Sequence, residues 1–202
     1  TVAAGTRYAA GAVHRWLLGP HYRDVWATPV RVEVLDLEGT AGGLEPTGTG
    51  GGMQTRSLRF EGADGREYAF RSIDKDPAAI LDPVWHGSAV HDIVQDGISA
   101  AHPYGALVAA PLLSAVGVLH VEPRLYVMPF DAKLGQYRSE FGGMLGLFEE
   151  RPDENGKRGP SFAGADKVIG SERLAERIAE GPDDRVDARA YLPARIIKDF
   201  IN

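Results

Sequence analysis

Alternating apolar and polar residues mark the predicted strands of this chain. Residues 30–37 (VRVEVLDL) alternate except at the adjacent Val34 and Leu35, and residues 57–60 and 67–73 flank the turn sequence Gly62-Ala-Asp-Gly65, which is typical of a hairpin. Two short apolar runs, 125–128 and 144–148, also predict strands. Between the first strand and the hairpin lies the glycine-rich segment 47–55 (TGTGGGMQT), which predicts a loop, as does segment 74–83 with its two Asp-Pro pairs.

Apolar residues at helical spacing alternate with clear stop signals in the remaining segments. Predicted helices cover 8–18, 88–101, 106–116, 172–179 and a last segment that begins after Asp187. Ser171 and Asp187 are the predicted N-caps of the last two. Pro193 either belongs to the first turn of the final helix or bends it.

These elements predict an α+β fold, with a twisted antiparallel sheet and helices packed against one of its faces. Pro, Gly and charged residues are dense in 151–164, which predicts a hinge. The expected organisation is an N-terminal helical arm over 1–29, a sheet-containing lobe over 30–150, the hinge over 151–164 and the start of a helical lobe over 165–202.

Composition excludes several classes of function. The 202 residues carry a formal net charge of −6, so the chain has no excess of Lys and Arg to neutralise the phosphates of nucleic acid or an anionic membrane. The absence of cysteine excludes disulfides, thiolate nucleophiles and zinc–thiolate sites. No apolar run reaches the length of about 18 residues that a membrane-spanning helix needs.

The glycine segment resembles neither of the common nucleotide-binding loops. Met53 and Gln54 stand where a P-loop needs Lys, and a strand rather than a helix is predicted after the glycines. A glycine loop between two strands is instead the placement of the phosphate-covering flap of protein kinases, which makes Gly50, Gly51 and Gly52 candidates for phosphate contact. A flexible connection without a ligand is the alternative.

Charged residues near the predicted hairpin and helix offer a second kinase-like feature. In a kinase small lobe a cation on the third strand is held by a carboxylate on the following helix. Here Arg71 or Lys75 would be the cation, and Asp92 or Asp96 the acid. The alternative is a set of surface ion pairs.

Glu149 and Glu150 end the apolar run MLGLFEE, at the position where a kinase hinge meets adenine. A charged strand end without a ligand would have the same sequence.

Four longer runs resemble a known family. They are GGGMQTRSLRF, FRSIDKDP, DIVQDGISAAHPYGALV and GVLHVEPRLYVMP. They are similar to poorly characterised bacterial envelope proteins that are often fused to a metallophosphoesterase domain and an outer-membrane β-barrel, with a segment similar to the HipA-like and CotH-like kinases. The resemblance covers residues 16 to 202.

The resemblance implies a kinase-like small lobe that binds ATP and Mg²⁺, within a cell-envelope or periplasmic protein whose partners are the rest of its own polypeptide or another envelope protein. In that family a stretch similar to DARAYLPARIIKDFIN precedes D-W-D-R-H, a sequence that looks like a catalytic loop, so phosphotransfer would need residues after Asn202. A complete domain with Asn202 as a C-terminal cap is the alternative.

Two departures from the kinase pattern indicate a pseudokinase or a non-catalytic interaction module. The strand cation is Arg, or a Lys displaced into the loop, and Arg brings a rigid fork where Lys brings a point charge. The helix acid is Asp where Glu is usual. A metal site at His86 and His91-Asp92 is a weaker hypothesis, because no second His-Asp pair follows in the order such sites need.

Overall fold

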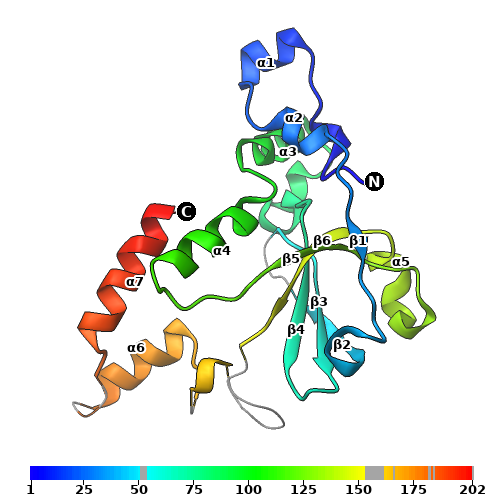
Figure 1. The fold of residues 1–202 in the computed structure, drawn as a ribbon. Coiled ribbons are helices and arrows are strands. Elements are labelled where there is room, and N and C mark those ends of the chain that lie inside the picture. The colour runs from blue at the N-terminus through cyan, green and yellow to red at the C-terminus, as the bar shows by residue number, and fades with distance from the viewer. Residues whose placement is uncertain (51–53, 153–161, 166, 182, 184, 202) are drawn as a thin grey trace.

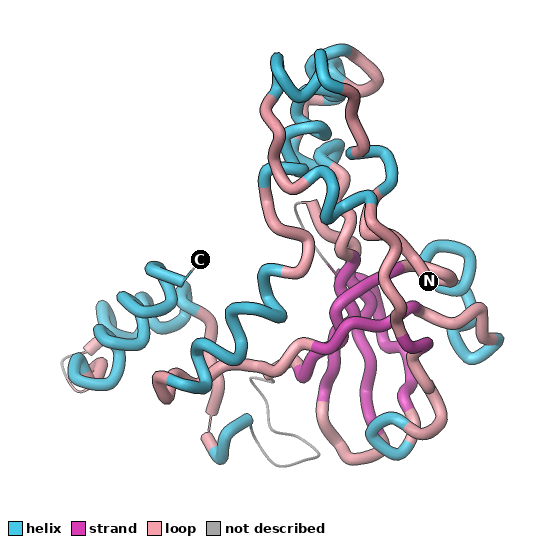
Figure 2. Tube along the Cα trace, turned by 45° about the horizontal axis from the view of Figure 1, so that its top comes forward, coloured by secondary structure: helices cyan, strands magenta, loops and turns pink. Residues whose placement is uncertain are grey.

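The computed structural model describes residues 1–50, 54–152, 162–165, 167–181, 183 and 185–201. It has an α+β fold in which one sheet lies between two groups of helices (Figures 1 and 2). The strands are β1 (Glu33–Val34), β2 (Leu44–Gly50), β3 (Ser57–Gly62), β4 (Glu67–Ser72), β5 (Arg124–Val127) and β6 (Leu145–Glu150). The α-helices are α1 (Ala12–Leu18), α2 (Arg23–Ala27), α3 (Ala89–Gly97), α4 (Gly105–Ala115), α5 (Arg138–Phe141), α6 (Ser171–Glu180) and α7 (Ala188–Ile201).

The sheet has the order β1-β5-β6-β4-β3-β2. The pairs β2–β3, β3–β4, β4–β6 and β5–β6 are antiparallel, whereas β1 runs parallel to β5 at the edge. The sheet is therefore mixed, and the expectation of a purely antiparallel sheet is wrong at that edge. The predicted hairpin 57–73 and the two later strands are present within one or two residues of their predicted bounds.

The two strands before the hairpin differ from the prediction. Within 30–37 only Glu33 and Val34 form a strand of the sheet, because the chain then bends where the Asp36 carboxylate accepts the N–H groups of Glu38 and Gly39. The strand that precedes the glycine segment is β2, which was predicted in part as loop. β2 tolerates its proline because it lies at the sheet edge, and the register shifts between Pro46 and Gly48.

Both faces of the sheet are covered, which corrects the expectation of helices on one face. On one face Leu58, Phe60, Phe70 and Phe148 pack with Leu35, Leu37, Leu44, Met128, Leu134 and Phe141. On the other, Ile73 and Leu145 pack with Ala4, Tyr8, Trp26 and Ile98. These two clusters are the hydrophobic core.

Much of the predicted N-terminal arm belongs to the second cluster. Tyr8 and Trp26 are each 1% exposed and their rings contact each other, with centroids 4.6 Å apart. Val2 also pairs with Val30 as an isolated bridge. Within this arm α1 lies farthest from the sheet, at the top of Figure 1.

The helix predictions hold for type and approximate position. Ser88 caps α3 by accepting the His91 N–H, and Asp187 accepts the N–H groups of Arg189 and Ala190 before α7. The predicted cap at Ser171 is wrong, because Gly170 is the N-cap and Ser171 is already helical. Pro193 lies inside α7, beyond its first turn. No helix in the described ranges combines the length and apolar character that crossing a bilayer requires.

Candidate functional site

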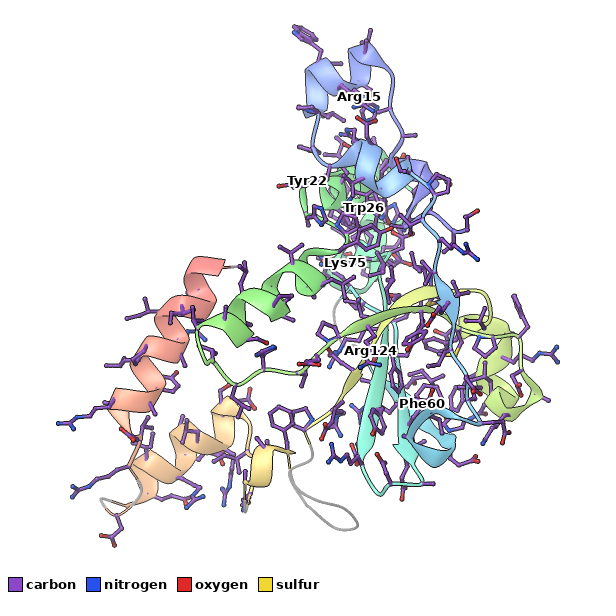
Figure 3. All side chains as sticks on the ribbon, in the orientation of Figure 1. Arg15, Tyr22, Trp26, Phe60, Lys75 and Arg124 are labelled. Carbon is purple, nitrogen blue, oxygen red and sulfur yellow. The ribbon has the colours of Figure 1, made fainter. Side chains whose placement is uncertain are left out.

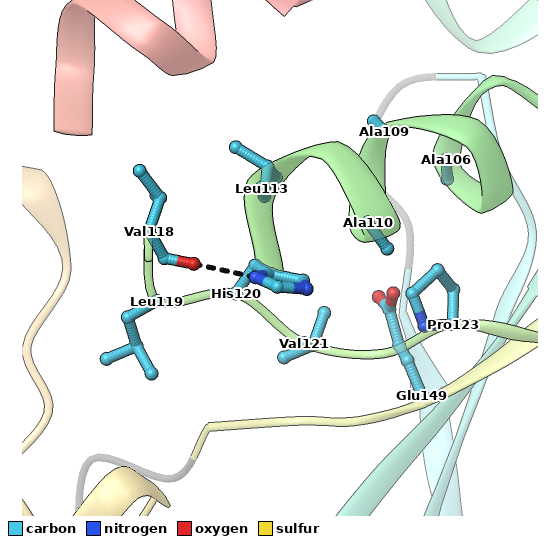
Figure 4. A pocket seen from close by; sticks show the side chains of 10 residues that line it. All are labelled: Ala106, Ala109, Ala110, Leu113, Val118, Leu119, His120, Val121, Pro123 and Glu149. Atoms are coloured by element: carbon cyan, nitrogen blue, oxygen red, sulfur yellow. Dashed lines mark hydrogen bonds between the residues drawn. The ribbon is translucent and has the colours of Figure 1, made fainter. Parts of the chain in front are cut away.

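The candidate site is the region where β4 and β6 face the start of α4. A cavity of about 230 Å³ lies there, and Arg71, Lys75, Trp26, His102, Gly105 and Leu147 are among its lining residues. A second cavity of about 300 Å³ is lined by α4, segment 118–123 and Glu149 (Figure 4). Ala106 lines both cavities, so they are neighbours along α4.

Arg71 projects from the face of β4 opposite the aromatic core. Phe70 is buried in that core, and because side chains alternate along a strand, Arg71 points to the other face. Its side chain is 46% exposed. The Arg71 Nε donates a hydrogen bond of 2.8 Å to Glu149 Oε1, which fixes the direction of the guanidinium while leaving its other N–H groups available for a ligand.

The Arg71–Glu149 pair corrects the expected pairing of Arg71 with an acid on the helix. Ala69 lies directly opposite Glu149 in the β4–β6 register, so Arg71 and Glu149 are diagonal neighbours on one face of the sheet. A diagonal pair on adjacent strands needs only the sheet register, whereas a helix must be placed by tertiary packing. Adjacent strands therefore supply the nearer carboxylate.

Asp96 has a different partner, Arg23 of α2. The two guanidinium Nη atoms donate to both carboxylate oxygens of Asp96 at 2.6 and 2.7 Å, and the Arg23 side chain is 0% exposed. His14 Nε2 lies 2.9 Å from Asp96 Oδ1. The hydrogen bonds from Arg23, together with the smaller effect of His14, lower the pKa of the Asp96 carboxyl. Asp96 is thus the counter-charge of a buried arginine and lies outside the cavity lining.

Asp92 contributes nothing to the cavity either. Its side chain is 82% exposed and its carboxylate lies 3.7 Å from the Nδ1 atom of its neighbour His91. Within the described part of the chain this contact is the only ion pair of Asp92, and its length of 3.7 Å is too long for a hydrogen bond.

Lys75 lies just beyond β4, beside the first turn of α4 (Figure 3). Both of its backbone groups are held by side chains. Its N–H donates to Asp74 Oδ1 at 3.0 Å, and its carbonyl accepts from Arg7 Nη2 and from Gln95 Nε2, each at 3.0 Å. The helix α3 therefore does reach the loop of the predicted cation, but with the amide of Gln95 in place of a carboxylate.

The start of α4 adds a third positive element to the first cavity. Gly105 and Ala106 line it, and in the described structure no side chain caps this helix end. The Gly105 and Leu107 N–H groups donate to the carbonyls of His102 and Tyr104, so the helix end favours an anion through the partial positive charge of its dipole rather than through a set of free donors. His102 precedes the helix and accepts the Tyr104 N–H on its Nδ1, which places the proton of a neutral ring on the Nε2 atom.

The remaining predicted residues lie apart from this cavity. Glu150 points to the opposite face, where the Arg66 Nη1 donates to it at 3.1 Å. Gly50 ends β2 and lies against the Arg59 side chain, since a Cβ there would be 3.1 Å from the Arg59 Nε. Gly51 and Gly52 lie outside the described residues.

The histidine and metal hypothesis receives no geometric support. His86 Nε2 lies 2.9 Å from the carbonyl oxygen of Ala78. Within the described part of the chain, no three His, Asp or Glu side chains gather closely enough to hold a metal ion.

Sequence reasoning missed three residues that organise the region: Tyr8, Arg23 and Gln95. Tyr8 and Arg23 act across 66 and 73 residues of sequence, on Asp74 and Asp96, and Gln95 acts across 20 residues on Lys75. The ring of Tyr8 belongs to an apolar face that periodicity can detect, but its hydroxyl partner lies on another element. No local pattern marks such pairs.

Searches against protein-family models, curated proteins and solved structures found no match to this chain.

Proposed function

We propose that this chain binds a nucleotide through its phosphate groups, as the small lobe of a kinase-like or pseudokinase module. One observation carries the proposal: Arg71 and Lys75 line the same cavity as the uncapped start of α4. Three positive elements that converge on one cavity favour an anion, and phosphate matches guanidinium geometry especially well. Glu149 orients Arg71 as the helix acid orients the strand cation in a kinase.

The neighbouring cavity suits the base of the same ligand. Ala109, Ala110, Leu113 and Val121 give it apolar walls, while the Glu149 carboxylate and the His120 ring are at its edge (Figure 4). Apolar walls with a few placed polar groups are typical of small-molecule sites. A base in this cavity and phosphates beside Arg71 and Lys75 would place one ligand along α4.

The order of elements also supports the kinase-like interpretation. β2, β3 and β4 form an antiparallel meander, α3 and α4 follow, and β5 and β6 complete the sheet, with β6 directly beside β4. That order is in keeping with the kinase-like fold that the resemblance of the four sequence runs implies, and the same resemblance suggests a bacterial cell-envelope protein. The proposal covers nucleotide binding; the resemblance assigns the aspartate needed for transfer to none of residues 1–202. When bound, Mg²⁺ would neutralise phosphate charge.

Calorimetric titration of the chain with Mg·ATP tests the proposal. Arg71→Ala and Lys75→Ala should each weaken binding by roughly 5- to 30-fold, because each removes one charge-assisted contact worth about 1 to 2 kcal/mol. Arg66→Ala is the matched control, since Arg66 also pairs with a β6 glutamate but on the opposite face. If all three variants bound Mg·ATP with the same affinity as wild type, the proposed site would be rejected.

Thermal unfolding gives an independent measurement. With ligand at about 100 times its Kd, stability should rise by about 2.7 kcal/mol. For a domain of this size that corresponds to a rise in Tm of roughly 5 to 10 °C. The same variants should lose this rise at a fixed ligand concentration, while Arg66→Ala should keep it.

A second candidate function is that of a non-catalytic interaction module, which would bind the rest of its own polypeptide or another envelope protein. The observation that favours it is α4, whose sequence GALVAAPLLSA has no charged residue although none of its residues is buried. Helices that are apolar on all sides are normally covered. Absence of any Mg·ATP response in wild type and in both cavity variants would favour this function.

A further inference from the structure

The loop that carries Lys75 is held by a network of side chains centred on Tyr8. The Tyr8 hydroxyl donates to Asp74 Oδ1 at 2.8 Å and accepts from Gln95 Nε2 at 2.6 Å. Asp74 and Gln95 also bind the backbone of Lys75. The Asp74 carboxylate accepts the Lys75 N–H, and the Gln95 amide donates to the Lys75 carbonyl. The Tyr8 hydroxyl therefore contacts both side chains that bind the Lys75 backbone.

Arg7, the neighbour of Tyr8, adds a third tether. Its Nη2 donates to the Lys75 carbonyl at 3.0 Å and lies 2.6 Å from Asp74 Oδ2. The short 3₁₀ helix Thr6–Tyr8 thus contacts the loop with two consecutive side chains. This is a connection between the N-terminal segment and the candidate anion site that spans more than 65 residues of sequence.

The Tyr8 ring is held rigidly enough to fix the position of its hydroxyl. It is 1% exposed and packs against Trp26, which itself lines the first cavity. Gly5 lies against the ring, because a Cβ at this position would be 2.7 Å from two ring carbons. Burial and the hydrogen bond to Asp74 raise the pKa of the Tyr8 hydroxyl, so it remains a donor throughout the physiological range.

The same loop is also tied to the C-terminal end of the glycine segment. The Asp76 N–H donates to the Gln54 carbonyl at 2.9 Å. Residues 74–76 are therefore held by the N-terminal segment and α3 and also by the end of the glycine segment.

We propose that Tyr8 is a positioning residue for the phosphate contact of Lys75. A lysine on an untethered loop would have to be ordered when it binds an anion, and that ordering would oppose affinity. Tyr8, through Asp74 and Gln95, orders the loop in the free protein. The inference rests on the proposed function, since it assigns Lys75 to the phosphate groups of the ligand.

Tyr8→Phe is the central test, because it removes the hydroxyl and keeps the ring that packs on Trp26. It should weaken Mg·ATP binding by about 3- to 10-fold, the equivalent of about one ordinary hydrogen bond. Tyr68→Phe is the matched control. Tyr68 also donates to an aspartate, Asp64, at 2.5 Å, but at the hairpin tip away from the cavity. The Tyr68→Phe variant should therefore bind Mg·ATP like wild type.

A double-mutant cycle separates positioning from general loosening of the fold. In a Lys75→Ala background Tyr8→Phe should change the Mg·ATP affinity by less than about 2-fold, because the group it positions is gone. A loss that persists in this background, or wild-type affinity in Tyr8→Phe, would overturn the inference. Gln95→Met, which removes both amide hydrogen bonds without altering the buried ring, should reproduce the loss if Tyr8→Phe does not fold.

Failure of the proposed function looks different. In that case wild type itself would not bind Mg·ATP, or Arg71→Ala would leave the affinity unchanged, and the inference would fall with it. Binding that depends on Arg71 and Lys75 but not on Tyr8 or Gln95 would remove the positioning role alone.

Discussion

Replacement of Asp96 by Asn should be among the most damaging single-atom changes to the stability of this protein. Arg23 is 0% exposed and both of its Nη atoms bind Asp96, whose side chain is 15% exposed. Asparagine keeps the size of the side chain but removes the charge and turns one acceptor into a donor that faces the guanidinium. The buried cation then has no counter-charge.

The size of the effect follows from the burial of the two partners. Breaking a fully buried ion pair costs about 3 to 5 kcal/mol, and the partial exposure of Asp96 lets water compensate some of this, so we expect a loss of roughly 2 to 4 kcal/mol. In a chain of this size that is a fall in Tm of roughly 4 to 16 °C. Urea titration followed by circular dichroism at 222 nm measures the free energy of unfolding.

Asp92→Asn is the matched control for this measurement, because Asp92 is on the same helix but is 82% exposed. It should change stability by less than about 0.5 kcal/mol. The reasoning would be refuted if Asp96→Asn and Asp92→Asn had the same denaturation midpoint. A further check is the double variant Arg23→Met/Asp96→Asn, which should be less destabilised than the sum of its single variants.

The same pair predicts how stability depends on pH. The pKa of Asp96 is lowered in the folded protein, so its contribution is complete above the unfolded pKa of about 3.9 and is lost as the pH falls through the folded pKa. Wild type should therefore lose stability relative to Asp96→Asn on acidification below about pH 5. A constant difference between the two proteins down to pH 2 would contradict the lowered pKa.

Two further predictions use matched positions in the core and on the surface. Gly146→Ala should destabilise the protein by about 1 to 3 kcal/mol in the same urea titration, since its Cβ would lie 2.3 Å from the Phe70 ring, whereas Gly97→Ala in α3, with nothing within 4 Å, should be neutral or stabilising. Trp26→Ala should cost about 3 to 5 kcal/mol and Trp16→Ala less than about 0.5 kcal/mol, because these side chains are 1% and 82% exposed; equal Tm values for the two variants would contradict the core assignment.

The sequence by itself determined the elements that depend on local chemistry. The hairpin 57–73 follows from alternation around a Gly-Ala-Asp-Gly turn, and the start of α3 from the Ser88 cap, because each needs only residues close in sequence. Composition and periodicity were sufficient for the α+β class. They failed for β2, whose glycines and proline are loop signals and become strand only because β3 supplies the hydrogen bonds at an edge.

The tertiary structure alone decided which charges meet. Arg71 had candidate acids on a helix, and the β4–β6 register gave it Glu149. Asp96 had candidate cations on the hairpin, but tertiary packing placed Arg23 of α2 beside it instead. Ion pairing is set by distances of a few ångströms, and the sequence separation of two charges does not fix such a distance when they lie on different elements. The contact of Tyr8 with Asp74 beside Lys75 depends on the same kind of long-range packing, which no local pattern encodes.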